Sequence, residues 1–171
     1  KPSQYLIIRS KRPVNQWFGN IPLSPMSQSQ KRPIDLLHGR IESGGIQALT
    51  QAERRLFAIT WLYLETNNGS LHQFFFNNAG KFATDALEGL EMVGAPQTAD
   101  ILRRAVALFP RGHVPTDQLE RRSVLVGLPD EIQWGRMGEL TNEFFQDKED
   151  VAQLVKDYIA AHPDLLPALQ Q

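Results

Sequence analysis

Apolar residues recur every three or four positions along most of the chain after residue 33, and glycine or proline separates the repeats. This spacing places the apolar side chains on one face of an α-helix. It predicts helices over the segments 51–66, 82–93, 96–109 and 149–161. In the last of these, Val151, Leu154, Val155, Tyr158 and Ile159 follow the full pattern. The sequence therefore predicts an all-α fold, with at most one short strand pair.

Local signals mark where the helices begin and end. Thr50 and Glu53 match a capping box, in which each side chain bonds the other residue's backbone N–H. The apolar residues that follow point in nearly all directions, so the first helix is expected to be central and buried. Gly69 is expected to end this helix, with Asn67 and Asn68 tolerating a left-handed backbone. Gly94 and Pro96 are expected to end one helix and open the next.

Residues 1–33 differ from the remainder. They contain five prolines, six basic residues and no acid, a balance of +6, and only Tyr5–Ile8 could form a short strand. The other 138 residues hold 12 basic and 19 acidic side chains, a balance of −7. We therefore predict a basic, proline-rich, extended N-terminal arm (1–33) and one compact helical domain (34–171). We expect Trp17 and Phe18 to anchor the arm on the acidic body; a flexible extension is the alternative.

Composition restricts the class of protein. A length of 171 residues suits one globular domain, and the absence of cysteine excludes disulfides and thiolate chemistry. No apolar run approaches the roughly 20 residues of a membrane span. We expect a cytoplasmic protein without membrane contact. Because the chain starts at Lys1 rather than Met, a removed export signal is an alternative.

No pattern in the chain indicates catalysis or metal binding. The four histidines lack the spacing of a metal site, and no nucleophile elbow, P-loop or dinucleotide motif occurs. We expect no catalytic residue, no metal and no cofactor, and hence a protein that is not an enzyme.

The most informative stretch runs from Glu65 to Gly80. Turn chemistry explains most of its amides and glycines, and we expect Phe74 and Phe75 in the core with Trp61 packed near them. The alternative is a polar pocket, for a small-molecule binder or an enzyme, walled by Asn67, Asn68, His72 and Gln73.

This stretch resembles the signature E-x-N-N-G-G-F-x-Q-F-F-x-N-x-x-G of a bacterial domain-of-unknown-function family that includes a DNA-mimic protein. Residues 86–95, a helix ending in Val-Gly-Ala, resemble its second signature, and the resemblance covers roughly residues 50–162. Ser70 and Leu71 depart from the first signature. The motif residues are Glu65, Asn67, Asn68, Gly69, Gln73, Phe74, Phe75, Asn77, Gly80 and Gly94. The resemblance implies an all-helical fold that acts by binding other proteins.

A DNA mimic needs carboxylates where a duplex has phosphates. The best candidate row would lie on one side of an unbroken helix about 27 Å long, against roughly 16 phosphate charges of a duplex. The row consists of Glu139, Glu143, Asp147, Asp150 and Asp157. Five carboxylates reach about a third of that charge, so mimicry requires a second row (Asp117, Glu120, Asp130 and Glu131) or a homodimer.

We therefore expect a non-enzymatic bacterial interaction protein whose acidic face binds a protein partner with a basic surface. A DNA-binding protein is one such partner, and a toxin neutralised by an immunity-type protein is another. Direct binding of nucleic acid is not expected.

Overall fold

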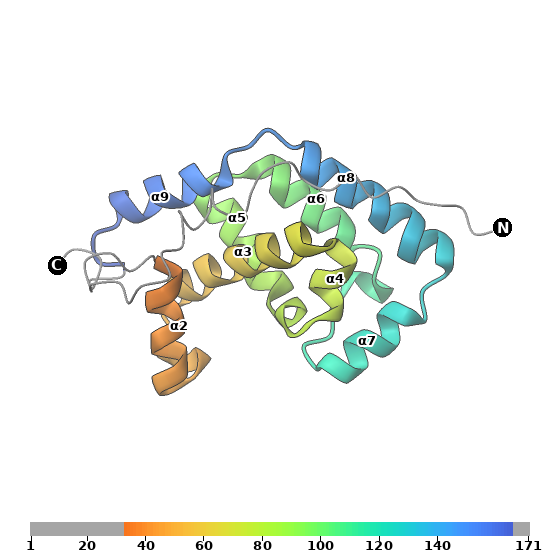
Figure 1. The fold of residues 1–171 in the computed structure, drawn as a ribbon, viewed down its shortest axis with the longest axis horizontal. Helices are drawn as coiled ribbons and strands as arrows, with labels where there is room; N and C mark the ends of the chain where they lie inside the picture. Colours follow the sequence, from red (N-terminus) through yellow and green to blue (C-terminus); the bar gives the residue numbers. More distant parts are fainter. Residues whose placement is uncertain (1–32, 166–171) are drawn as a thin grey trace.

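The computed structural model describes residues 33–165, with side chains from Leu37 onward. This part of the chain is built from helices and contains no strand, which confirms the all-α prediction (Figure 1). The helices are α2 (Pro33–Gly44), α3 (Gln51–Asn68), α4 (Leu71–Phe76), α5 (Ala83–Val93), α6 (Pro96–Val106), α7 (Gln118–Val126), α8 (Met137–Gln146) and α9 (Val151–Ala161). The strand expected at Tyr5–Ile8 and the docking of the arm fall outside the described residues.

Short helical segments connect these elements. They are the 3-10 turns η2 (Ile46–Ala48), η3 (Asn78–Phe82) and η4 (Pro110–Gly112), and the π-helical segment η5 (Glu131–Arg136). Helix α3 lies in the centre and packs against α2, α4, α5 and η3 (Figure 1). Helix α5 also packs against α6 and α9, α6 against α8, and α4 against α7 and α8.

Helix α3 begins with the predicted capping box. The Thr50 backbone N–H donates to Glu53 Oε2 at 2.8 Å, and the Glu53 backbone N–H donates to Thr50 Oγ1 at 3.3 Å. Glu53 is buried and also contacts Arg40 of α2. The cap therefore fixes both the start of α3 and its contact with α2.

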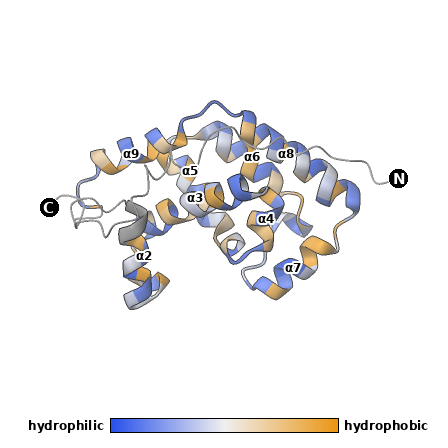
Figure 2. Cartoon of the chain, in the orientation of Figure 1, coloured by the Kyte–Doolittle hydropathy of each residue, from blue (hydrophilic) through white to orange (hydrophobic). Residues whose placement is uncertain are grey.

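The core contains Phe74 and Phe75 as predicted, but the ring contacts of Trp61 are with other residues than these two. Phe74 and Phe75 are fully buried, and the Phe75 ring packs edge-on against Phe109 with centroids 4.9 Å apart. Trp61 packs against the rings of His38 and Phe57, at the α2 side of α3. Figure 2 shows hydrophobic and hydrophilic residues alternating along the helices, as amphipathic helices around a single core require.

Several boundaries differ from the prediction. Gly69 caps α3 with φ −157°, so neither it nor the helical Asn67 and Asn68 adopts the left-handed backbone expected there. Gly94 does cap α5 in the left-handed region, with φ 81°, and Pro96 opens α6. The segment around Phe74, which periodicity left unclassified, is the six-residue helix α4.

Candidate functional site

The signature residues form a polar cluster around the Glu65 carboxylate at the end of α3. Gln73 Nε2 and Asn77 Nδ2 both donate to Glu65 Oε2, at 3.0 Å and 2.8 Å. A methyl group on Gly69 would lie 2.0 Å from Gln73 Oε1, so only glycine lets Gln73 cross the turn to reach Glu65. The cluster ties α3 to both ends of α4.

A buried arginine holds the other side of this turn. Arg121 of α7 has no exposed surface, and its guanidinium donates to the carbonyl oxygens of Phe75 at 2.7 Å and Asn77 at 2.8 Å. It also donates to Pro115 O at 2.9 Å and Thr116 O at 3.0 Å. Burial lowers the pKa of Arg121 and Arg122 adds to this, whereas Asp117 raises it; arginine remains charged regardless.

Gly80 makes room for this arginine. A Cβ there would lie 2.7 Å from Arg121 Nε and from Phe75 O, and 2.9 Å from Phe74 O. Two of the three obstructing atoms are backbone atoms that cannot rotate away. Gly80 is therefore required by the close approach of the α7 side chain to α4.

The four residues of the alternative polar pocket do not face one cavity. Asn67 Nδ2 donates to the Tyr63 carbonyl of its own helix, and Asn68 is exposed. Gln73 turns to Glu65, whereas His72 Nε2 lies 3.1 Å from Gln133 Oε1 of η5. The turn thus acts structurally, and its side chains point in different directions.

His72 belongs to a stack of rings on the surface between α4, α7 and η5. Its ring stacks on Trp134 with centroids 4.4 Å apart and lies parallel to Phe76 at 6.1 Å. On Phe76 the Arg122 guanidinium lies 4.3 Å from the ring centroid. Burial lowers the pKa of His72, and the hydrogen bond with Gln133 partly offsets this.

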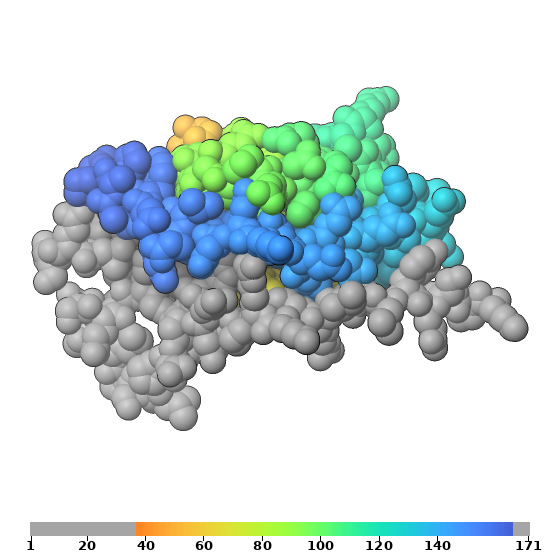
Figure 3. All heavy atoms as spheres, turned by 90° about the horizontal axis from the view of Figure 1, so that it is seen from above, coloured from red at the N-terminus to blue at the C-terminus, as the bar shows by residue number. Residues whose placement is uncertain are grey.

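The predicted acidic row does not lie on one helix. Helix α8 ends at Gln146, and a new helix starts at Val151, with Asp150 as its N-cap accepting from the Gln153 backbone N–H at 3.1 Å. Asp147 therefore lies in the connecting loop, and its Oδ2 contacts the Thr98 hydroxyl at 2.6 Å. The row was predicted to share one side of a helix only if that helix is unbroken. This condition is not met, because Asp150 caps a separate helix. Figure 3 shows α8, the loop and α9 as one band along α5 and α6.

Two members of the row are paired with arginines. Glu139 contacts Arg136 at 3.0 Å, and Glu143 contacts Arg104 at 2.5 Å. In contrast, Asp157 is exposed and accepts from Gln153 Nε2 at 2.7 Å.

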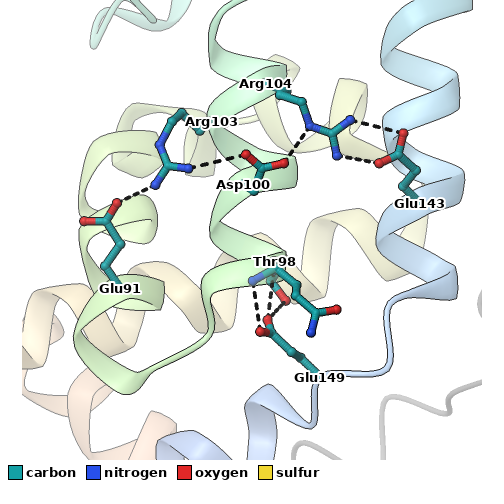
Figure 4. A network of polar contacts seen from close by, with 8 residues as sticks. Glu91, Thr98, Asp100, Arg103, Arg104, Glu143 and Glu149 are labelled. Carbon is teal, nitrogen blue, oxygen red and sulfur yellow. Dashed lines mark hydrogen bonds and ion pairs between the residues drawn. The ribbon is translucent and has the colours of Figure 1, made fainter.

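The pair between Glu143 and Arg104 is one end of a longer network, drawn in Figure 4. Arg104 also contacts Asp100 at 2.8 Å, and Arg103 bridges Asp100 to Glu91, at 3.6 Å and 2.6 Å. The network joins α5, α6 and α8. Its side chains are about half exposed, so each pair contributes roughly 0–1 kcal/mol. It also neutralises the middle of the face on which a mimic would present charge.

Below the network, Glu149 caps the N-terminus of α6 (Figure 4). Its carboxylate accepts from the backbone N–H groups of Gln97 at 2.9 Å and Thr98 at 2.8 Å. These amides would otherwise lack partners at the helix terminus. This contact fixes the α8–α9 loop on α6, and the sequence pattern did not predict it.

The second acidic row lies at the other end of the band, on α7 and η5. Its members Asp117, Glu120, Asp130 and Glu131 are all exposed. Asp117 is the N-cap of α7, where its Oδ1 accepts from the Glu120 backbone N–H at 2.8 Å. This row therefore does not lie beside the first row along a common helix; it continues the band past α8.

Two cavities of similar size flank the core. One, of about 500 Å³, lies between α6 and α8 and is lined by Arg104 and Glu143 of the network. The other, of about 530 Å³, lies among α2, η2, α3 and η3. Its lining residues include Glu65 and Asn77 of the signature, together with the rings of Phe57, Trp61 and Phe82. Sequence reasoning missed this second cavity, because it is formed by packing of α2 against α3 and η3.

Within the described residues, no group of three or more acidic or histidine side chains is placed to hold a metal ion. No helix in that same part of the chain is long and apolar enough to cross a bilayer.

These observations define a small all-α domain whose signature residues hold α3, α4 and α7 together and whose candidate carboxylates are distributed from α7 to α9. Residues 47–162 match the family described as DMP19-like protein, and the chain belongs to that family. The matched range agrees with the extent of the resemblance seen in the sequence. No curated protein and no solved structure matches the chain significantly.

Proposed function

We propose that this protein is a non-enzymatic interaction protein that binds a partner with a basic surface through the carboxylates of the η5–α8–α9 band. The observation that supports this is that the carboxylates at the two ends of the band are exposed and are not paired with arginine or lysine in the described part of the chain. Asp130 and Glu131 at one end are exposed, and Asp150 and Asp157 at the other accept hydrogen bonds from neutral donors of Gln153. Hydrogen bonds hold Asp150 and Asp157 in place, and all four carboxylates are exposed and so accessible to a cationic partner.

The middle of the band decides what form the binding takes. Glu139 and Glu143 are paired with arginines, so the band offers two acidic patches with a neutralised centre. A duplex carries about one charge per 1.7 Å without such a gap. A DNA-binding partner that contacts the two patches, or a homodimer that joins two bands, fits this pattern. Mimicry of DNA toward a basic DNA-binding protein is the form of binding that we propose.

The test is competition between this protein and duplex DNA for the same partner. The whole chain is used to capture basic proteins from a bacterial lysate, and each captured DNA-binding protein is purified and titrated by calorimetry. We expect binding to weaken as salt is raised, because exposed charges are screened, and duplex DNA to displace the chain. Simultaneous binding of DNA and chain, or affinity independent of salt, would contradict the proposal.

Single-charge variants locate the surface. Asp150→Asn keeps the N-cap, since asparagine caps helices as well as aspartate does, and removes one negative charge. Asp157→Asn likewise removes one negative charge, on the exposed face of α9. We expect each to lower the association rate severalfold. Glu42→Gln, an equal change on exposed α2, is the matched control and should have no effect.

A further inference from the structure

The cavity among α2, η2, α3 and η3 contains a carboxylate whose partners are neutral. Glu65 lines it, and its contacts in the described part of the chain are the two amide donors on Oε2, from Gln73 and Asn77. Its other oxygen, Oε1, accepts from neither. A partly buried carboxylate without a cation is costly, because amides replace only part of its hydration. This cavity therefore has a place for a positive charge.

The walls of the cavity suit the apolar and the cationic parts of one ligand. Ile41 and Ile46 provide aliphatic surface, and three aromatic rings also line the cavity. The Phe57 ring packs edge-on against Trp61 and Phe82, with centroids 6.1 Å and 5.6 Å away. Aromatic faces attract ammonium groups, by about 0.5–1 kcal/mol at exposed sites and more when desolvated. The structure already places the Lys81 ammonium 4.9 Å from the Phe82 centroid.

Lys81 also lines this cavity, and its positive charge could attract an anionic ligand instead. Its side chain is exposed, so water screens its charge and its long stem is free to move. Glu65 is partly buried and fixed by two amides, so its field inside the cavity is the stronger of the two. In the α6–α8 cavity, by contrast, the lining carboxylates Asp100 and Glu143 are paired with Arg104.

We propose that this cavity binds an organic ammonium ion, with the ammonium group at Glu65 and the apolar body against Ile41, Ile46 and Trp61. A cavity of about 530 Å³ is within the usual range for small-molecule sites. The inference is independent of the acidic band, since none of the band carboxylates lines this cavity.

The test compares two small molecules of similar size and opposite charge. Phenethylamine and hydrocinnamate are titrated into the whole chain by calorimetry. We expect phenethylamine to bind at least about tenfold more tightly, which corresponds to about 1.4 kcal/mol. Equal affinities, tighter binding of hydrocinnamate, or no detectable heat with phenethylamine up to its solubility limit would overturn the proposal.

Glu65→Gln is the decisive variant, since glutamine keeps the shape and can accept from Gln73 and Asn77. Phenethylamine affinity should fall about tenfold, whereas the charge-matched control Glu120→Gln, on the exposed face of α7, should leave it unchanged. Unchanged affinity in Glu65→Gln would refute the assignment of the ammonium to this carboxylate. A thermal melt of each variant shows whether any loss of binding is due to unfolding.

The location is tested separately by fluorescence. The chain contains three tryptophans, Trp17, Trp61 and Trp134. A variant with Trp17→Phe and Trp134→Phe leaves Trp61 as the sole indole reporter. Its emission should change in proportion to the calorimetric saturation by phenethylamine. Saturation without any change at Trp61 would place the ligand elsewhere and overturn the proposal.

Discussion

Replacing Arg121 by methionine tests whether a buried cation organises the signature turn. Methionine has a similar length and fills the same space, so the change removes the guanidinium and leaves the packing largely intact. The carbonyl oxygens of Phe75, Asn77 and Pro115 then lose a charged donor within 2.7–2.9 Å. The contacts to Phe75 O and Pro115 O are buried, and the contact to Asn77 O is partly buried.

The expected cost follows from that count. Leaving one buried acceptor unsatisfied costs about 1–3 kcal/mol, and the three share one environment, so their costs do not simply add. We expect Arg121→Met to lower the free energy of unfolding by about 3–5 kcal/mol, comparable with breaking a buried ion pair. For a domain of this size that corresponds to a melting temperature roughly 10 °C lower. The stability of Arg121→Lys should lie between those of the parent chain and Arg121→Met, because an ammonium cannot reach all the carbonyls at once.

Urea unfolding followed by circular dichroism measures the difference. Arg103→Met is the matched control; it removes an arginine about half exposed, paired with Glu91 and Asp100, and should cost less than about 1 kcal/mol. Gly80→Ala should also destabilise, since its methyl group meets Arg121 Nε at 2.7 Å. The double variant with Arg121→Met and Gly80→Ala should lose less stability than the sum of the two single changes. An Arg121→Met variant as stable as the control would refute the role given to the guanidinium.

Three further perturbations test the packing, the loop and the histidine. Phe75→Ala should cost about 3–5 kcal/mol in a thermal melt, because the ring is fully buried against Phe109; an unchanged melt would show that the ring does not pack there. Glu149→Ala should cost about 1–2 kcal/mol by urea unfolding, since it uncovers two amides at the start of α6; a loss no larger than that of Glu42→Ala would argue against capping. Because burial lowers the pKa of His72, the unfolded chain binds its proton more readily, and stability should fall as pH drops below about 6.5. His72→Gln should reduce the difference in unfolding free energy between pH 7.5 and pH 5, and an unchanged difference would mean that other groups cause it.

The sequence predicted what depends on neighbouring residues. The capping box of Thr50 and Glu53 and the stop at Gly94 are determined within one turn of helix, and both were confirmed. The break between α8 and α9 also had a local signal, since Asp150 stands three residues before Gln153 and directly before the apolar pattern. The helix predicted over 149–161 agrees with α9, whereas the row of carboxylates needed an unbroken helix, and that condition is not met.

What depends on packing between distant segments was not predicted. Nothing around Arg121 in the sequence distinguishes it from the neighbouring Arg122, yet one is fully buried under α4 and the other is partly exposed over the Phe76 ring. Similarly, the residues that line the cavity among α2, η2, α3 and η3 come from positions 41 to 82. Their convergence depends on how α2 crosses α3, which no spacing rule determines.

The roles of the signature residues bear on where a partner can bind. Gly69, Gln73, Phe74, Phe75 and Gly80 are all engaged in holding α3, α4 and α7 together. None of the exposed carboxylates of the acidic band belongs to the signature. The signature residues therefore form a scaffold, and the binding face that we propose lies outside them. Glu65 and Asn77 are exceptions, because both hold the turn and line a cavity. A ligand bound at Glu65 would therefore contact the same side chain that joins α3 to α4.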